Sequence, residues 1–267
     1  MNASLIGFLA FCAISSPLCA QMRIPPELLE DPHFREEFGI NEVTTPSIER
    51  IFDQLEALGP LDAELFSRKV SEAQPLERSK LSLSLGGLIA EGFFQAQTQD
   101  VRSLEKVGKA ITQRATALGT GETLSSHSRA LLERSKDADW DEFRQELAKT
   151  QRDVELELIR LRDVEAVNLI SFGGWLRAME VLCEVSANPF DPEKAALVQR
   201  LDILTYYAEE FAHLHPRTQE EKLIRNLRKE LDDLQRLLKG IGSTPPSRRQ
   251  FEQIRRVVAR MADDAFE

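Results

Sequence analysis

Two glutamates and a histidine in the stretch YYAEEFAHLHP have a spacing that suits metal ligands. Glu209 precedes His213 by four residues and Glu210 precedes it by three, so on a helix each carboxylate would share a face with the imidazole. A Glu-x-x-His pair is half of the ligand set of a di-iron bundle, which needs a second pair on a facing helix. The sequence offers no second pair. This favours the other interpretation, a helix C-terminus whose dipole and carboxylates attract His213 and His215.

A second candidate site is a set of charged residues within two strongly apolar segments. Arg177 and Glu180 lie on one side of a predicted helix over residues 164–187, and Glu91 lies in a predicted helix over residues 76–99. If these helices faced each other, Glu91, Arg177 and Glu180 would form a polar cleft able to bind a small polar ligand. In the other interpretation, which we favour, each helix turns one charged edge to solvent and Arg177 pairs locally with Glu180.

Signatures of known catalytic and cofactor sites are absent from the sequence. It contains no phosphate-binding glycine loop, nucleophile elbow, cysteine–histidine zinc spacing or acidic calcium loop, and LGTGET at residues 118–123 lacks the lysine of a P-loop. His127 lies in a predicted serine-rich turn. Cys183 lies among apolar residues, which indicates a buried thiol rather than a nucleophile. We therefore expect no cofactor and favour a protein that is not an enzyme.

The charge of the chain is acidic, with a formal net charge of -10 and a pI near 5.1. Lysines and arginines form no block in the sequence, so a face that follows a phosphate backbone is not indicated, and we expect no nucleic-acid partner. Because 42% of the side chains are hydrophobic, the chain can bury a substantial core.

The first residues have the pattern of a secretory signal peptide. An apolar run extends from Leu5 to Ile14, a proline follows at Pro17, and a small residue, Ala20, marks the expected cleavage site. A short membrane anchor or a buried helix is the alternative, but the run is too short to span a bilayer, and no later segment is apolar enough to do so. The sequence therefore predicts export to the periplasm or the extracellular space, with residues 1–20 removed.

The rest of the chain is predicted to be all-α, with about ten helices and no strands. Residues 21–45 carry three prolines and no sustained period, which indicates an extended arm. Residues 46–267 show helical periodicity almost throughout. The predicted helices cover residues 47–58, 61–72, 76–99, 101–118, 123–136, 139–162, 164–187, 192–215, 218–239 and 248–265. Apolar residues in the ninth of these repeat at coiled-coil spacing.

Glycine pairs occur in the middle of two of these helices, in SLGGLIAEGFF at residues 84–94 and in SFGGWLRAMEV at residues 171–181. A glycine inside a helix costs about 1 kcal/mol relative to alanine, so Gly86, Gly87, Gly173 and Gly174 need a compensating gain. Close approach of two helix backbones would supply it. We therefore predict that these helices cross at the glycines.

The glycine motifs also suggest an internal repeat. Similar series of helices follow each motif, which predicts two divergent repeats over residues 76–162 and 163–267, arranged around a pseudo-twofold axis and preceded by leading helices in residues 46–75. The function class predicted from all these features is a non-catalytic interaction or scaffold module. It would bind another protein or itself through the arm or through acidic outer faces. The alternative is a bundle that binds a small ligand or a metal between the repeats.

Overall fold

The computed structural model describes residues 68–69, 73–99, 101–121, 127, 130–131, 133–134 and 139–267. Regular structure in these ranges is helical throughout, without a strand, as the sequence predicts. The helices are α4 (Arg78–Thr98), α5 (Val101–Leu118), α7 (Trp140–Arg160), α8 (Val164–Ala187), α9 (Pro192–Ala196), α10 (Leu201–His213), α11 (Pro216–Gln219), α12 (Lys222–Ile241) and α13 (Arg248–Phe266).

Several predictions fall outside the described residues. These are the signal peptide, the arm at residues 21–45, the leading helix at residues 47–58, most of the helix expected over residues 61–72, and most of the helix expected over residues 123–136. Residues 68 and 69 of the second leading helix are described and are not helical. Among the helices that are described, none is both long enough and apolar enough to cross a bilayer.

Local capping explains where several helices begin. The side chains of Asp139 and Asp163 accept hydrogen bonds from the backbone N–H groups of Glu142 and Ala166, at the starts of α7 and α8. Ser247 starts α13 with a capping box, in which its side chain and that of Gln250 satisfy each other's backbone N–H. These residues place three helix starts within one or two residues of the predicted positions.

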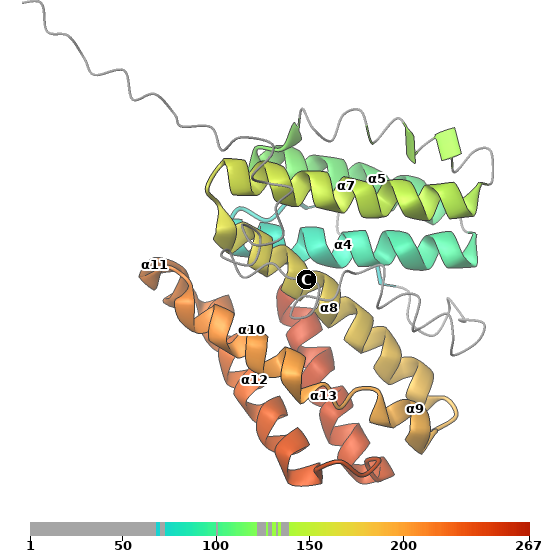
Figure 1. Cartoon of the computed structure of the whole chain (residues 1–267), viewed down its shortest axis with the longest axis vertical. Coiled ribbons are helices and arrows are strands. Elements are labelled where there is room, and N and C mark those ends of the chain that lie inside the picture. Colours follow the sequence, from blue (N-terminus) through green and yellow to red (C-terminus); the bar gives the residue numbers. More distant parts are fainter. Residues whose placement is uncertain are drawn as a thin grey trace, which may run out of the picture.

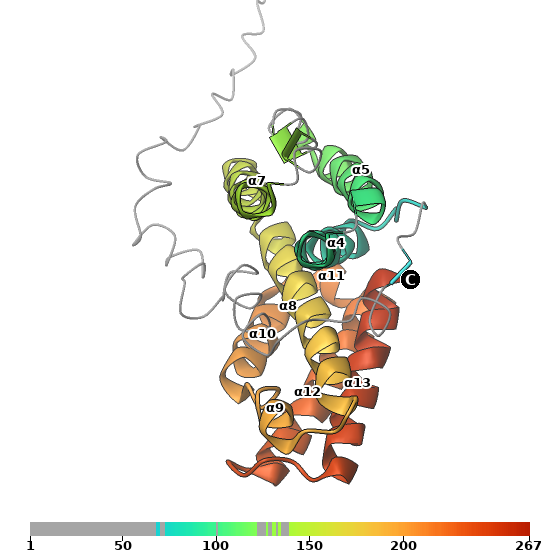
Figure 2. The same cartoon turned by 90° about the vertical axis from the view of Figure 1, so that its right-hand side faces the viewer.

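Helix α4 lies at the centre of one half of the fold. All of its residues between Leu81 and Ala96 are buried, as expected for a helix without a consistently polar face. Helices α5 and α7 run alongside it in the upper part of Figure 1, and all three are seen nearly end-on in Figure 2. Their apolar side chains form one hydrophobic core.

Helix α8 joins this half to the other. It crosses α4 and then extends into the lower half of Figure 1, where it packs beside α9 and α13. One side of α8, with Ile170 and Val181, belongs to the core around α4. Another side, with Phe172 and Trp175, belongs to a second core shared with α10, α12 and α13. The apolar character of α8 therefore serves two cores at once.

The repeating apolar residues of the predicted ninth helix form the buried face of α12. Ile224, Leu227, Leu231, Leu234 and Leu238 are all at most 3% exposed. Helix α12 directs them toward α10 and α13, its two main neighbours. The apolar residues at coiled-coil spacing therefore pack α12 against α10 and α13 within the same chain.

The single helix predicted over residues 192–215 is wrong, because the chain leaves helical geometry between α9 and α10. Val198 lies in this break and is completely buried, as is Ala195 just before it. A new helix then starts after Arg200, whose carbonyl accepts the N–H of Leu204. Burial of Val198 in the core of this half is a tertiary constraint, and the local helical period does not reveal it.

The predicted start of the next helix is also displaced, from residue 218 to Lys222. The short helix α11 comes first, and the hydroxyl of Thr218 donates a hydrogen bond of 3.0 Å to the Glu165 carboxylate of α8. This contact fixes the turn before α12 against the start of α8, so the long helix begins one turn later than its sequence pattern indicates.

Candidate functional site

The two glycine motifs meet where α4 crosses α8. A methyl group built on Gly86 would lie 1.9 Å from the carbonyl oxygen of Ile170, and one built on Gly173 would lie 2.1 Å from the carbonyl oxygen of Leu83. Both separations are far below van der Waals contact, so only a hydrogen atom fits between the backbones. The predicted crossing of these helices is therefore correct for Gly86 and Gly173.

Gly87 and Gly174, the second glycines of the two pairs, have different environments from each other. A methyl group on Gly87 would lie 2.4 Å from the aromatic ring of Phe266 at the end of α13, rather than against α8. The backbone nitrogen of Gly174 lies 2.8 Å from the methyl position of Gly86, so it is part of the close crossing. Gly87 thus gives room to an aromatic side chain, while the other three glycines line the contact between α4 and α8.

A buried ion pair lies on the same two helices, one turn beyond the glycines. The Arg177 guanidinium donates from Nε and Nη2 to one carboxylate oxygen of Glu91, over 2.9 and 2.7 Å. Arg177 is 2% exposed and Glu91 4% exposed. The guanidinium also lies over the Phe94 ring, 5.5 Å from its centroid, and Gln95 donates to the second oxygen of Glu91. Every side of this pair is therefore occupied by the protein.

The ion pair continues toward the surface through Glu180. Arg177 donates to Glu180 over 2.7 Å, and Arg68 donates to the same carboxylate over 2.8 Å. Arg68 also pairs with Asp263 and Glu267 of the C-terminal segment. Burial alone would lower the pKa of Arg68, but its hydrogen bonds to Glu180 and Asp263 raise that pKa above its ordinary value. The result is a row of alternating charges that ties α4, α8 and α13 together.

The structure thus brings together the three predicted ligand-binding residues Glu91, Arg177 and Glu180. The favoured expectation of a solvated edge is wrong for Arg177 and Glu91, which are buried, although the local pair between Arg177 and Glu180 does form. The charged edge of α8 becomes more exposed to solvent only further along the helix, where Glu184 pairs with Arg255 of α13 over 2.8 Å. The sequence pattern could not reveal this, because the approach of α4 is what removes the edge from water.

The residues considered as metal ligands lie at the end of α10. His213 is its last residue, and His213 and Glu209 are exposed. Glu210 is half-buried and accepts a hydrogen bond from Asn168 of α8, and burial raises the pKa of its carboxyl, opposed by the charge of His213. Within the described residues, no three histidine, cysteine, aspartate or glutamate side chains form a group that could hold a metal ion.

His127 is a polar residue whose environment the sequence pattern did not reveal. Its imidazole is buried, and its two nitrogens lie 2.6 Å from a Glu146 oxygen and 2.8 Å from an Asp153 oxygen. Both carboxylates belong to α7 and are seven residues apart, two turns along one face. This spacing is the only local signal that could have suggested a common partner.

Cys183 is a core residue of α8, as predicted. Its side chain is 1% exposed and belongs to the core shared with α10, α12 and α13. Burial raises the pKa of the thiol well above its ordinary value, and the nearby charge of Glu184 acts in the same direction. The thiol is therefore protonated and inert at neutral pH.

Comparisons with known proteins identify no relative of this chain. No protein-family model matches it, and no significant match was found among the curated proteins or among the solved structures. The functional interpretation of the chain therefore depends on its own residues.

Proposed function

We propose that the chain is an exported, non-catalytic helical scaffold that binds another protein or a second copy of itself. The observation that carries this proposal is the mutual pairing of the buried charges. Arg177 is held by Glu91 and Glu180, and Glu180 is held in turn by Arg68. Buried charges that are paired in this way hold helices in one arrangement, because breaking any pair leaves an uncompensated charge. In this proposal the buried ion pairs hold the helices in a fixed arrangement, and the outer faces of the helices bind the partner.

We also infer that the two halves, residues 76–162 and 163–267, are divergent repeats. Gly86 faces the carbonyl of Ile170, and Gly173 faces the carbonyl of Leu83, so each glycine meets the residue three positions before the other glycine. Such a reciprocal contact is what a local twofold axis produces, as in isologous interfaces between identical subunits. In this arrangement the α4–α8 crossing joins the two repeats rigidly, and each repeat exposes its own helices for binding.

The alternative function is binding of a small polar ligand at the α4–α8 crossing. It is favoured by the convergence of Glu91, Arg177 and Glu180, since perturbed or clustered charges in a low-dielectric region are typical of binding sites. A ligand there would have to replace one carboxylate of Glu91 or Glu180 as the partner of Arg177. An anionic ligand could do so only if α4 and α8 moved apart at the glycines.

Native mass spectrometry and elemental analysis of residues 21–267, purified without a histidine tag, distinguish these functions. The scaffold proposal predicts the mass of the polypeptide alone, or of its multiples, with no stoichiometric metal. A retained small molecule that is lost in an Arg177→Met variant would establish the alternative and overturn the proposal.

Crosslinking tests the binding function directly. A photoreactive amino acid would replace Leu161 in one variant and Leu197 in another, two exposed apolar residues that lie in different halves of the chain. The protein would be produced in the cells from which the sequence comes. We expect at least one position to give a discrete adduct with another protein or with a second copy. If neither position, nor any other exposed position, gives an adduct, the scaffold proposal is wrong.

A further inference from the structure

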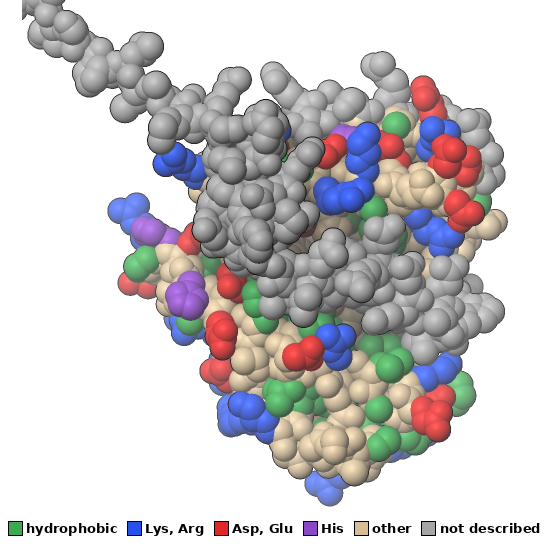
Figure 3. Space-filling model, in the orientation of Figure 1, with side chains coloured by type: hydrophobic (Ala, Val, Ile, Leu, Met, Phe, Trp, Pro, Cys, Tyr) green, Lys and Arg blue, Asp and Glu red, His purple; other side chains and the backbone are tan. Residues whose placement is uncertain are grey.

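The C-terminal pair of helices carries a charge opposite to that of the whole chain. Residues 222–266, which span α12 and α13, contain eleven lysines and arginines but only six aspartates and glutamates, although the chain has a formal net charge of -10. The basic residues are separated in the sequence, but the helical repeat of α12 and α13 brings several of them onto the same faces. On the face seen in Figure 3, by contrast, acidic and basic side chains are interspersed.

An open groove lies between α12 and α13, with a volume of about 440 Å³. Leu237 and Val257 supply its apolar surface. The remaining residues that line it are polar or charged: Asp233, Arg236, Gln253, Arg256 and Arg260. Three arginines and one carboxylate therefore line the groove beside an apolar strip, which consists of the half-buried Leu237 and of Val257, which is 6% exposed.

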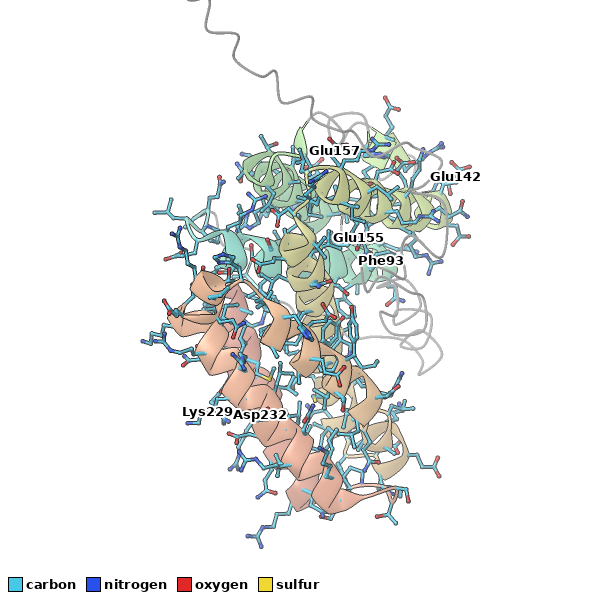
Figure 4. All side chains as sticks on the ribbon, turned by 60° about the vertical axis from the view of Figure 1, so that its left-hand side comes forward. Phe93, Glu142, Glu155, Glu157, Lys229 and Asp232 are labelled. Carbon is cyan, nitrogen blue, oxygen red and sulfur yellow. The ribbon has the colours of Figure 1, made fainter. Side chains whose placement is uncertain are left out.

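The basic character of the groove continues beyond its ends. Lys229 precedes Asp233 by one helical turn on α12, and Arg249 precedes Gln253 by one turn on α13. Both Lys229 and Arg249 are exposed, and Figure 4 shows Lys229 projecting outward from α12. Residues on each helix thus form a row along the groove. The α12 row begins with Lys229 and the α13 row with Arg249, whereas Asp264 follows Arg260 by one turn at the other end of the α13 row.

The three arginines differ in how firmly they are paired. Arg236 is 73% exposed in its side chain and pairs with Asp233 on the same helix, and a solvent-exposed pair of this kind adds little stability. Arg260 pairs over 3.0 Å with Glu230, which is largely buried. No carboxylate in the described part of the chain pairs with Arg256, which is exposed. Of the three, Arg256 is therefore the arginine most available to donate hydrogen bonds to a carboxylate of a partner molecule.

We propose that the groove between α12 and α13 binds an acidic amphipathic helix of a partner protein. Apolar side chains of that helix would contact Leu237 and Val257, and its flanking carboxylates would pair with Arg256, Arg236 and the basic residues beyond the groove ends. This is the helix-in-groove mode of recognition, with arginine providing bidentate contacts. The proposal rests on the scaffold function proposed above and names the chemistry of the partner.

The composition of the groove favours a protein over a polyphosphate or a membrane. A phosphate backbone would gain nothing from the apolar strip, whereas an amphipathic helix would bury apolar side chains against it. An anionic membrane would require a broad basic face, whereas this groove is bounded by two helices and has room for only a few side chains. An amphipathic acidic helix matches both the charge and the apolar strip.

Fluorescence anisotropy with a defined probe tests this proposal. The probe is a labelled synthetic peptide of about 15 residues with leucines at helical three- and four-residue spacing and glutamates on both flanks. A peptide of the same composition in scrambled order controls for charge alone. We expect the patterned peptide to bind the full mature chain, and the scrambled one to bind at least about tenfold more weakly.

Charge-reversal variants locate the binding surface. Arg256→Glu should weaken peptide binding by about tenfold or more, because an attractive pair becomes a repulsive one. The matched control is Arg217→Glu, which makes the same charge change at an exposed residue of α11 outside the groove. Leu237→Asn tests the apolar strip without changing the charge and should also weaken binding. Circular dichroism would verify that each variant is folded.

Three results would overturn the proposal. They are equal affinity for the patterned and scrambled peptides, equal losses from Arg256→Glu and Arg217→Glu, and preferential binding of duplex DNA or of anionic phospholipid vesicles by the groove. Concentration-dependent dimerisation that Arg256→Glu abolishes would assign the groove to a second copy of the chain instead. If the groove fails these tests while crosslinks form at Leu161 or Leu197, only this inference is wrong and the scaffold function stands.

Discussion

Gly173 lies so close to Leu83 that a methyl group on its α-carbon would come within 2.1 Å of the Leu83 carbonyl oxygen. The reciprocal contact, Gly86 against Ile170, is closer still at 1.9 Å. The obstacle in both cases is backbone rather than a side chain that could rotate away. The distance between α4 and α8 is therefore set by the absence of two methyl groups, and the buried ion pair between Arg177 and Glu91 depends on that distance.

Alanine at Gly86 or Gly173 should destabilise the fold strongly. The methyl group would force α4 and α8 apart, and we expect the free energy of unfolding to fall by about 3 kcal/mol or more, beyond the usual range of overpacking because backbone cannot yield. Urea denaturation followed by circular dichroism would measure the loss. Gly108 on α5 is the matched control, since no atom lies within 4 Å of its methyl position. Gly108→Ala should raise stability by about 1 kcal/mol through helix propensity. A Gly86→Ala variant as stable as the natural protein would show that the crossing is looser than described.

Alanine at Gly87 should have a smaller effect that depends on Phe266. The methyl group would meet the edge of the Phe266 ring at 2.4 Å, and a terminal aromatic side chain can shift more readily than backbone. In a Phe266→Ala background the obstacle is gone, and Gly87→Ala should be close to neutral or slightly stabilising. A double-mutant cycle by thermal unfolding measures this coupling. Additive effects of the two substitutions would contradict the contact.

The Arg177–Glu91 pair should behave as a buried ion pair. Arg177→Met alone leaves Glu91 charged without its cation, and we expect a loss of about 3–5 kcal/mol. Adding Glu91→Gln should recover much of this loss, since the buried charge is removed and Gln95 keeps an acceptor. The comparison pair is Arg200 and Asp202, both substantially exposed, whose coupling should be below about 1 kcal/mol. Similar coupling energies for the two pairs, measured by chemical denaturation, would argue against the buried arrangement.

Glu230 should make stability depend on pH. Burial raises the pKa of its carboxyl above the ordinary 4.5, opposed by its pairing with Arg260. As pH rises from about 4.5 through the higher folded-state pKa, the unfolded chain has lost this proton while the folded chain still holds it, so the free energy of unfolding decreases. Glu230→Gln should remove this decrease, and the stability difference between variant and natural protein should grow with pH across the window. A constant difference between Glu230→Gln and the natural protein across this window would contradict the raised pKa.

The sequence determined the features of this protein that depend on neighbouring residues. Capping residues such as Asp163 and Ser247 act on backbone groups two or three positions away, so the starts of α8 and α13 were predictable. The buried face of α12 follows from apolar residues one turn apart. The glycine pairs indicated a close crossing because a glycine inside a helix has a local cost that only a tertiary contact offsets.

Only the tertiary structure decided which faces meet and how the charges are used. Glu91 lies 86 positions from Arg177, and no local pattern distinguishes a solvated charged edge from one that a second helix covers. The break at Val198, the carboxylate partners of His127 and the gathering of separated arginines between α12 and α13 have the same origin. Each depends on packing between helices that are distant in the chain, and the free energy of that packing belongs to the assembled core rather than to any segment of the sequence.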